Sequence, residues 1–502
     1  MKAPNRIISS VALAAGLLAL SSCEKFLDVN QNPNLLLQAP PANVLVAGQA
    51  HLGFLMGSDL HRYSSLIAQQ FSGQGGSGTQ TAEYDRYNIT ATDLNNVWRG
   101  GIYGGAQADL QRLVLQTEST SPAYAGVARI MQAFLFSVTT DAFGDIPFAE
   151  ALKFDQNLQP KYDASDKVYT GIIALLNAGL ADLKKSSLES PTSDDLIYRG
   201  DLTKWVKLAN TLKLRLYLHS FPKTSATANA DFAAVLAGVA TNPIMTSNAD
   251  NFQLAFEPTP NKNNSIDQFE KSRPSTFFPS ATLVNLMNTK ADPRRSVFLT
   301  VAPNPPAPEP ALPAGTYIGA VNGTGAAGAP NVRFSRMGTY LRGASTGAGV
   351  NSYDGAAPIR MLTFAEQNFM LAEYYARTGD LVRAQSAYEA GITASLTLAG
   401  VATTPVTALG AVYLAARPPL TATNAIQQII EEKFIANFGV AVEPWTDFRR
   451  TRFPALTLPT GALQPQILRI LPYPDLERVA NPANTPARPA LTAPSVFWDP
   501  GI

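Results

Sequence analysis

Cysteine and histidine are almost absent from this chain of 502 residues, which contains one cysteine and three histidines. A lone cysteine cannot form a disulfide within the chain, so packing alone must stabilise the core. The histidines, His51, His61 and His219, are scattered without the spacing of zinc ligands. A serine nucleophile motif is absent as well. We therefore expect no catalysis, no metal and no cofactor.

Charged residues are also scarce. They make up 15% of the chain against 46% hydrophobic residues, which is the balance of a globular protein. Bases and acids nearly cancel, to a net charge of +1, and no basic run occurs. Nucleic-acid binding and electrostatic docking to a membrane therefore have no support. Beyond the N-terminal segment, no apolar stretch is long enough to cross a bilayer.

The N-terminus begins with two bases, Lys2 and Arg6, and an apolar run from Ile7 to Leu20. The run is shorter than the ~20 residues of a membrane span, which predicts a secretory signal over residues 1–22. Leu20-Ser21-Ser22-Cys23 resembles the cleavage site of bacterial lipoproteins. The resemblance implies that the sulfur of Cys23 carries a diacylglycerol group and that Cys23 becomes the first residue. A chance cysteine beside an ordinary cleavage site is the alternative.

After a polar tether at residues 23–40, the hydrophobic periodicity predicts a mainly α chain with long irregular loops and few short strands. Helices are predicted over residues 42–71, 106–116, 122–141, 163–185, 203–220 and 424–437, with coil after that. Alternating side chains at Phe252–Phe256 predict one short strand. We expect a single domain over residues 41–502, interrupted by a proline-, alanine- and glycine-rich insertion at about 301–332.

Residues 363–395 predict a pair of helices. Thr363 and Glu366 have the spacing of a capping box, Gly379 suits a left-handed helix end, and Asp380 can cap the next helix. The second helix carries a narrow seam formed by Ala384, Ala387, Tyr388, Gly391 and Ile392. The pair resembles a tetratricopeptide-type hairpin, but its period does not recur as a regular solenoid requires.

Several separated blocks follow one pattern along the chain. They are Thr140–Ala151 (TDAFGDIPFAEA), Gly200–Arg215 (GDLTKWVKLANTLKLR), Asp292–Arg294, Met361–Glu366 with Leu371–Glu373, Trp445–Thr451 (WTDFRRT), and Leu471–Pro474 with Glu477 and Arg478. In this order they resemble the SusD/RagB family of Bacteroidetes outer-membrane lipoproteins, in its SusD-like branch. Phe143 and Phe448 depart from the pattern, at positions where tryptophan is frequent.

The resemblance implies a SusD-like fold in which helix pairs support a loop-rich ligand face. It also implies a lipid-anchored protein of the cell outer membrane that captures an oligosaccharide or peptide and delivers it to a SusC-like TonB-dependent transporter. A surface glycan-degrading enzyme and a helical-repeat envelope scaffold are the alternatives. For an enzyme, Asp141 and Asp145 are close enough in sequence to act as paired acids. We interpret all the blocks as architecture, because arginine–carboxylate pairs tie loops to helix ends.

Sugars present apolar C–H faces surrounded by hydroxyls, so a binding site needs exposed aromatic planes beside polar groups. Three polar regions of the chain combine such residues. From them we predict eight ligand-binding residues: Tyr84, Asp85, Tyr87, Asn88, Trp98, Arg273, Phe277 and Tyr353. For each aromatic residue among them, packing against a neighbouring helix is the alternative.

Overall fold

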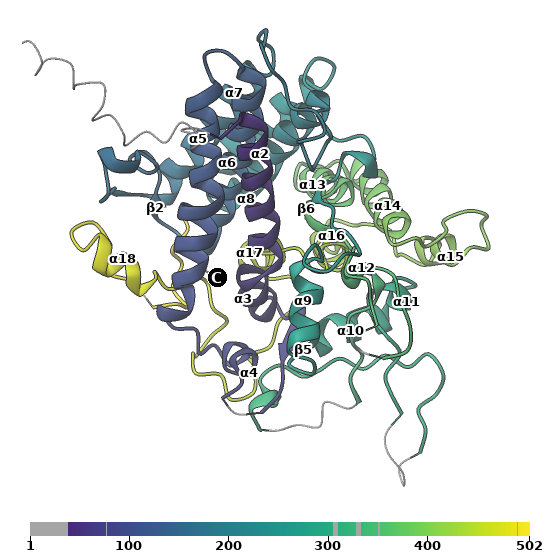
Figure 1. Ribbon diagram of the computed structural model, residues 1–502. Coiled ribbons are helices and arrows are strands. Elements are labelled where there is room, and N and C mark those ends of the chain that lie inside the picture. The colour runs from purple at the N-terminus through teal and green to yellow at the C-terminus, as the bar shows by residue number, and fades with distance from the viewer. Residues whose placement is uncertain are drawn as a thin grey trace, which may run out of the picture. The chain divides into compact units, whose positions relative to one another are not determined.

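The computed structural model describes residues 39–76, 78–304, 310–327, 333–349, 352–488 and 490–501. The predicted signal, Cys23 and nearly all of the predicted tether lie outside the described residues, as do parts of the predicted insertion. Residues Pro41–Ile502 form one compact unit, whose helices and strands are labelled in Figure 1.

The first half of this unit is built from helices. They are α2 (Pro41–Gly57), α3 (Asp59–Ile67), α4 (Gln80–Asp85), η2 (Thr92–Leu94), η3 (Val97–Gln107), α5 (Ala108–Thr117), α6 (Pro122–Phe143), η4 (Phe154–Gln156), α7 (Ser165–Asp182) and α8 (Leu202–Ala237). The long helix α6 contacts α5, α7 and α8, and α2 contacts both η3 and α5. Figure 1 shows these long helices gathered on one side of the unit.

The second half has shorter helices and longer loops. Its helices are η5 (Asn248–Asp250), α9 (Ser265–Ser272), α10 (Ala281–Thr289), α11 (Arg295–Phe298), η6 (Thr324–Ala327), α12 (Thr339–Arg342), α13 (Phe364–Arg377), α14 (Leu381–Leu398), α15 (Leu409–Ala415), α16 (Ala425–Ala436), α17 (Glu443–Thr451) and α18 (Asp475–Ala480). The last two correct the prediction of coil after residue 437. Both are short, so neither repeats an apolar stripe often enough to be read from the sequence.

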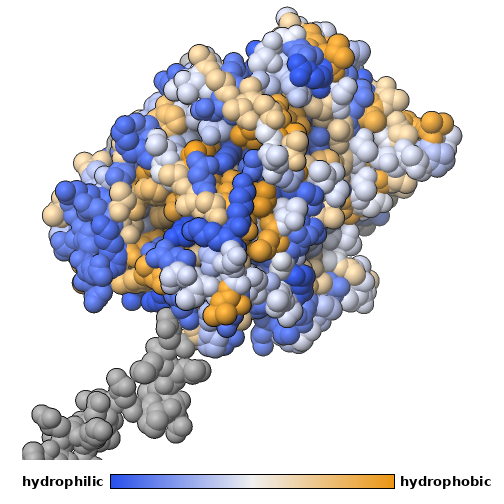
Figure 2. All heavy atoms as spheres, turned by 90° about the horizontal axis from the view of Figure 1, so that it is seen from above, coloured by the Kyte–Doolittle hydropathy of each residue, from blue (hydrophilic) through white to orange (hydrophobic). Residues whose placement is uncertain are grey.

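The described residues contain three antiparallel strand pairs, two of which connect distant parts of the chain. β1 (Phe71–Gly73) pairs with β5 (Phe277–Pro279), β2 (Ile146–Pro147) with β3 (Tyr162–Asp163), and β4 (Phe252–Leu254) with β6 (Ile359–Leu362). In the first pair, Phe71 lies opposite Pro279. The predicted mainly α fold with few short strands is confirmed. Figure 2 shows that hydrophobic and hydrophilic residues are intermixed on one face of the protein.

Two predicted helices have different limits in the structure. The helix predicted over residues 42–71 is divided at Ser58, whose non-helical backbone (φ −108°, ψ −126°) separates α2 from α3. The helix predicted over residues 203–220 continues as α8 to Ala237, past Pro222 and through a break at Thr224 (φ −132°, ψ 45°). Proline removes one helical hydrogen bond, so the chain bends there but resumes its helix.

The predicted helix pair is present as α13 and α14, which pack against each other. The Thr363 hydroxyl accepts a hydrogen bond from the Glu366 amide at 3.2 Å, and Gly379 has the left-handed φ of +85°. The Asp380 carboxylate accepts from the Arg383 amide at 2.9 Å. The capping box is only half formed, because the Glu366 carboxylate pairs with Arg215 of α8 instead.

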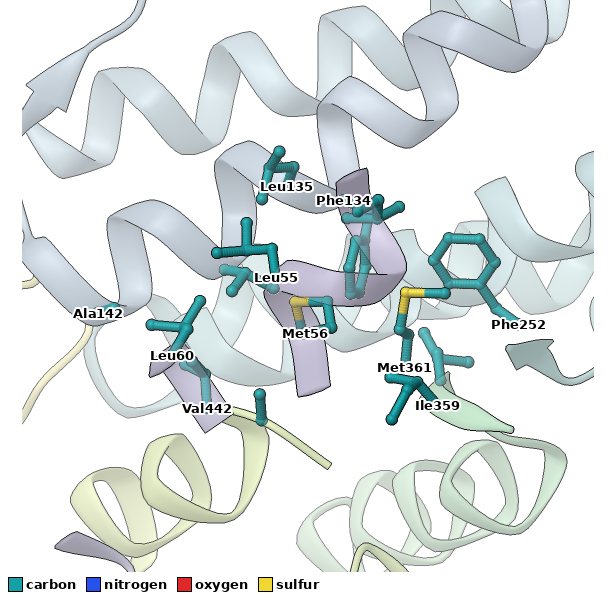
Figure 3. Close-up of a cluster of buried hydrophobic side chains, with 14 of the residues drawn as sticks. Leu55, Met56, Leu60, Phe134, Leu135, Ala142, Phe252, Ile359, Met361 and Val442 are labelled. Carbon is teal, nitrogen blue, oxygen red and sulfur yellow. The ribbon is translucent and has the colours of Figure 1, made fainter. Parts of the chain in front are cut away.

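The largest core cluster joins the N-terminal helices to the middle of the chain. Figure 3 shows side chains from α2, α3, α6, the β4–β6 pair and the residue before α17 converging: Leu55, Met56, Leu60, Phe134, Leu135, Ala142, Phe252, Ile359, Met361 and Val442. Each of them is at most 5% exposed. Burial of such side chains stabilises a fold by about 1.5–3 kcal/mol each.

Buried ion pairs tie elements of the second half to one another. Arg294 pairs with Asp292 and Glu432, and Arg450 binds both oxygens of Glu373 at 2.5 Å. All of these side chains are buried. Asp292, Arg294, Glu373 and Arg450 belong to the blocks that resemble the family. Because these residues pair with one another inside the core, their contacts support the interpretation of the blocks as architecture.

Candidate functional site

A hollow of about 520 Å³ lies between η3, the β2–β3 segment and α18. Its aromatic lining consists of Trp98, Tyr103 and Phe154. The aliphatic lining includes Leu152, Leu158 and Leu476, and the polar lining consists of Arg99, Arg112, Asn157 and Glu477. A concave surface that combines apolar planes with a few polar groups is the usual setting of a ligand site.

The helix η3 brings two of these rings together because it is a π-helix, in which hydrogen bonds join residues i and i+5. Trp98 and Tyr103 are five residues apart, and in an α-helix their side chains would point about 140° away from each other. Here the ring centroids lie 4.8 Å apart. The Tyr103 hydroxyl donates to the Pro147 carbonyl at 2.7 Å, which fixes the ring against β2.

Trp98 forms the floor of the hollow. Its side chain is 5% exposed. It packs edge-on against Phe143 at 5.0 Å and Tyr473 at 6.2 Å, and parallel to Tyr162 at 6.3 Å. Tyr103 and Phe154 are only half-buried, so they offer more ring surface to a ligand than Trp98 does.

The carboxylate of Glu477 is already engaged, because it accepts a hydrogen bond from the Tyr162 hydroxyl at 2.7 Å. Burial, with the charge of Glu477, raises the pKa of Tyr162, so this phenol stays a donor. On the other wall, the guanidinium carbon of Arg112 lies 5.1 Å from the centroid of the Phe154 ring. The hollow can therefore receive the apolar face of a ring-shaped ligand and donate hydrogen bonds to its edge.

The predicted ligand-binding loops meet around α9. The β1–β5 pair joins the segment before Tyr84 to the segment after Arg273, and the Thr81 hydroxyl donates to the Thr276 carbonyl at 2.7 Å. Lys271 of α9 donates to the Tyr353 carbonyl at 2.6 Å, which brings in the third loop. Trp98, by contrast, lines the hollow beside α18.

Five of the eight predicted residues are buried, so the expectation that they are exposed is wrong. They are Tyr84, Asp85, Tyr87, Trp98 and Phe277, and each is at most 5% exposed. Phe277 stacks on Phe71 of the paired strand, with centroids 4.3 Å apart. The Asp85 carboxylate accepts from Ser72, Asn322 and the Gly323 amide at 2.6–2.9 Å. These side chains hold distant segments together.

The other three predicted residues are accessible, and their contact with a ligand stays a prediction. Arg273 is exposed, with its guanidinium carbon 5.4 Å from the Phe269 centroid. Tyr353 is half-buried, with Arg342 over its ring at 4.2 Å. Asn88 is half-buried and donates to Glu83 at 3.1 Å.

Sequence reasoning missed Arg99, Tyr103, Arg112 and Phe154 as lining residues. The available signal was the glycine-rich segment around Tyr103. Glycine is unfavourable inside a regular helix, so an aromatic residue with glycines on both sides differs from the sequence of the neighbouring helices. No comparable signal marks Phe154, which lies in a polar stretch and meets η3 and α5 only through the fold.

The carboxylates Asp141 and Asp145 do not form an open acid pair. Asp141 is buried, where it accepts from Tyr169 at 2.5 Å and from Trp498 at 3.0 Å. In the described ranges, no group of three or more His, Cys, Asp or Glu side chains is arranged to hold a metal ion. Among the helices of the same ranges, none combines the length and apolar character needed to cross a bilayer.

A family described as "Starch-binding associating with outer membrane", of the SusD-like type, matches residues 32–474. The match covers most of the chain. The protein belongs to this SusD-like family. A comparison with curated proteins finds no match.

Several solved structures share the fold. A chitin-binding protein has a TM-score of 0.73 at 24% identity, over 89% of this chain and 95% of its own. A SusD homologue from Bacteroides uniformis has a TM-score of 0.73 at 20% identity, over 91% and 99%. A chitin-binding SusD homologue from Flavobacterium johnsoniae has a TM-score of 0.68 at 20% identity, over 91% and 100%.

Proposed function

We propose that this SusD-like protein is a lipid-anchored protein of the outer membrane that binds oligosaccharide in the hollow beside η3. The bound sugar is then delivered to a SusC-like TonB-dependent transporter, without a catalytic step. The observation that carries the proposal is the pairing of Trp98 and Tyr103 with Phe154 in one concave surface, in a family described as starch-binding. Two structural relatives that are described as chitin-binding support a sugar ligand.

Calorimetric titration with malto- and chito-oligosaccharides tests this function. Because Phe154 offers ring surface to the hollow, Phe154→Ala is expected to weaken binding by about tenfold or more. Phe54→Ala is the matched control, since Phe54 is a half-exposed ring on α2 outside the hollow. Absence of oligosaccharide binding by the native protein contradicts the proposal.

The lipid anchor is tested at the predicted first residue of the mature protein. Mass spectrometry of the N-terminal peptide is expected to find Cys23 with a diacylglycerol group on sulfur, and Cys23→Ser is expected to release the protein from the membrane fraction. A mature protein that starts elsewhere, or lacks lipid, contradicts this part of the proposal.

The transporter partner is tested by purification from native membranes. We expect an outer-membrane barrel to co-purify with the tagged protein, and recovery as a free monomer alone contradicts the partnership. An enzyme is the competing class. Release of reducing sugar by the purified protein, abolished by substitution of one carboxylate, is the result that favours it.

We also propose that Asn88, Arg273 and Tyr353, the accessible residues near α9, contact the parts of a long ligand outside the hollow. Tyr353→Ala is then expected to weaken binding of long oligosaccharides more than that of short ones. An equal effect on both lengths contradicts a role in chain-length recognition.

A further inference from the structure

The charge of the hollow comes from three lining residues, Arg99, Arg112 and Glu477. Glu477 already accepts a hydrogen bond from the Tyr162 hydroxyl, so one of its two carboxylate oxygens is engaged within the protein. Arg99 is exposed on η3 and forms no ion pair with any carboxylate of the described residues. The lining therefore has more positive than negative charge.

Arg112 is only weakly neutralised. Its side chain is 58% exposed, and its guanidinium lies 3.3 Å from Asp109, near the limit of a hydrogen bond. The other carboxylate oxygen of Asp109 is 2.7 Å from the ring of His51, so Arg112 shares its acidic partner. The guanidinium of Arg112 also lies over Phe154, which places a cation beside the aromatic surface proposed to receive a sugar ring.

We propose that the hollow selects an acidic oligosaccharide, in which a sugar carboxylate binds Arg99 and Arg112 while the sugar ring packs on Phe154. This inference rests on the proposed function and names its substrate class. Guanidinium groups match the two oxygens of a carboxylate, and here they stand at the rim of an apolar hollow rather than on an open surface. A neutral ligand makes no use of this excess positive charge.

The test compares a tetramer of galacturonic acid with its methyl ester, which has the same rings and linkages but no charge. Calorimetry at low salt is expected to show the acid binding about tenfold tighter, since two exposed charge pairs contribute that much. The difference is expected to shrink at 0.5 M salt because screening weakens exposed charge pairs. Equal binding of acid and ester overturns the inference.

The variant Arg99→Gln with Arg112→Gln is expected to lose the preference and to bind acid and ester alike. Arg383→Gln is the matched control, because Arg383 is 64% exposed, pairs with Asp380 three residues earlier and lies 4.5 Å from the Tyr375 centroid, away from the hollow. It is expected to keep the preference. Loss of preference in the control as well overturns the role of Arg99 and Arg112.

The two proposals fail in different ways. Binding of neutral malto- or chito-oligosaccharides with no preference for the acid overturns the acidic specificity and leaves oligosaccharide capture intact. Binding of a glutamate-rich peptide in place of all the sugars overturns both proposals.

Discussion

Arg215 and Glu366 form a two-point ion pair in the core, with Nε 2.9 Å from Oε1 and Nη2 2.8 Å from Oε2. Arg215 belongs to α8 and Glu366 to the first turn of α13. The Arg215 guanidinium also donates to the Met361 carbonyl at 3.0 Å. This pair therefore connects the helices of the first half to the hairpin and to β6.

Arg215→Ala is expected to lower the free energy of unfolding by about 3–5 kcal/mol, because the buried Glu366 then loses both hydrogen bonds from the guanidinium and keeps only Lys433, 3.7 Å away, as a cationic neighbour. Urea denaturation followed by circular dichroism measures the change. The exposed pair of Arg383 with Asp380 supplies the comparison, and Arg383→Ala is expected to leave the free energy of unfolding nearly unchanged. Similar losses of unfolding free energy in Arg215→Ala and Arg383→Ala contradict the idea that burial makes the Arg215 pair more important for stability than the exposed pair.

The stability is expected to fall as the pH rises above about 6.5, in part because of His219. Burial alone lowers the pKa of His219, but the carboxylates of Glu443, 3.2 Å from Nε2, and Asp141, 3.3 Å from Nδ1, raise it overall. A histidine whose pKa is higher in the folded protein than in the unfolded chain contributes its full stabilisation at pH values below the pKa of the unfolded chain. This contribution is lost as the pH rises through the pKa of the folded protein.

Urea titrations between pH 5 and 9 measure this slope. His219→Gln is expected to flatten it above about pH 6.5. His51→Gln is the control, since its ring is 53% exposed, and it is expected to keep the slope. An unchanged slope in His219→Gln contradicts the role of this side chain.

Asp85 produces a pH dependence at lower pH. Burial raises its pKa to about 7, although hydrogen bonds from Gly323, Asn322 and Ser72 oppose the shift. From about pH 4 the unfolded carboxyl ionises while the folded one keeps its proton, so stability falls as the pH rises towards 7. Asp85→Asn is expected to reduce this slope between pH 4 and 7, whatever its effect on absolute stability, and an unchanged slope contradicts the assignment.

Gly391 allows the close packing of the α13–α14 pair. A Cβ atom at this position would lie 2.9 Å from the ring of Phe369, which is fully buried. Gly391→Ala is expected to cost about 1–3 kcal/mol in thermal or urea unfolding, because the ring has no free space to move into. Gly238→Ala at the end of α8, where the nearest atom is 3.5 Å away, is expected to have little effect.

The hairpin was predictable from sequence because its signals are local. Thr363, Gly379 and Asp380 act on amides and backbone angles within a few residues of themselves. The cap of α8 is also a local contact, since Asp201 accepts from the Thr203 amide at 3.0 Å, but our sequence analysis did not predict it. The division at Ser58 has no such signal, because the apolar stripe continues on both sides of it.

The binding residues were harder to predict, since exposure depends on contacts between distant segments. Phe277 lies in a polar stretch, yet its ring is covered by Phe71, some two hundred positions earlier in the chain. Asp85 resembles a ligand carboxylate in sequence and is instead closed in by Asn322. Conversely, Phe154 lines the hollow together with residues of other segments, among them Arg112 of α5, whose guanidinium lies over its ring.

The π-helical geometry of η3 makes the aromatic pair depend on the type of helix, because Trp98 and Tyr103 meet across its five-residue repeat. Ordinary α-helical hydrogen bonding at the same chain length would leave the two side chains about 140° apart around the helix axis. Deleting one residue between them restores a four-residue spacing, which an α-helix places on one face. The wider helical turn, as much as the two aromatic residues, therefore creates this part of the hollow.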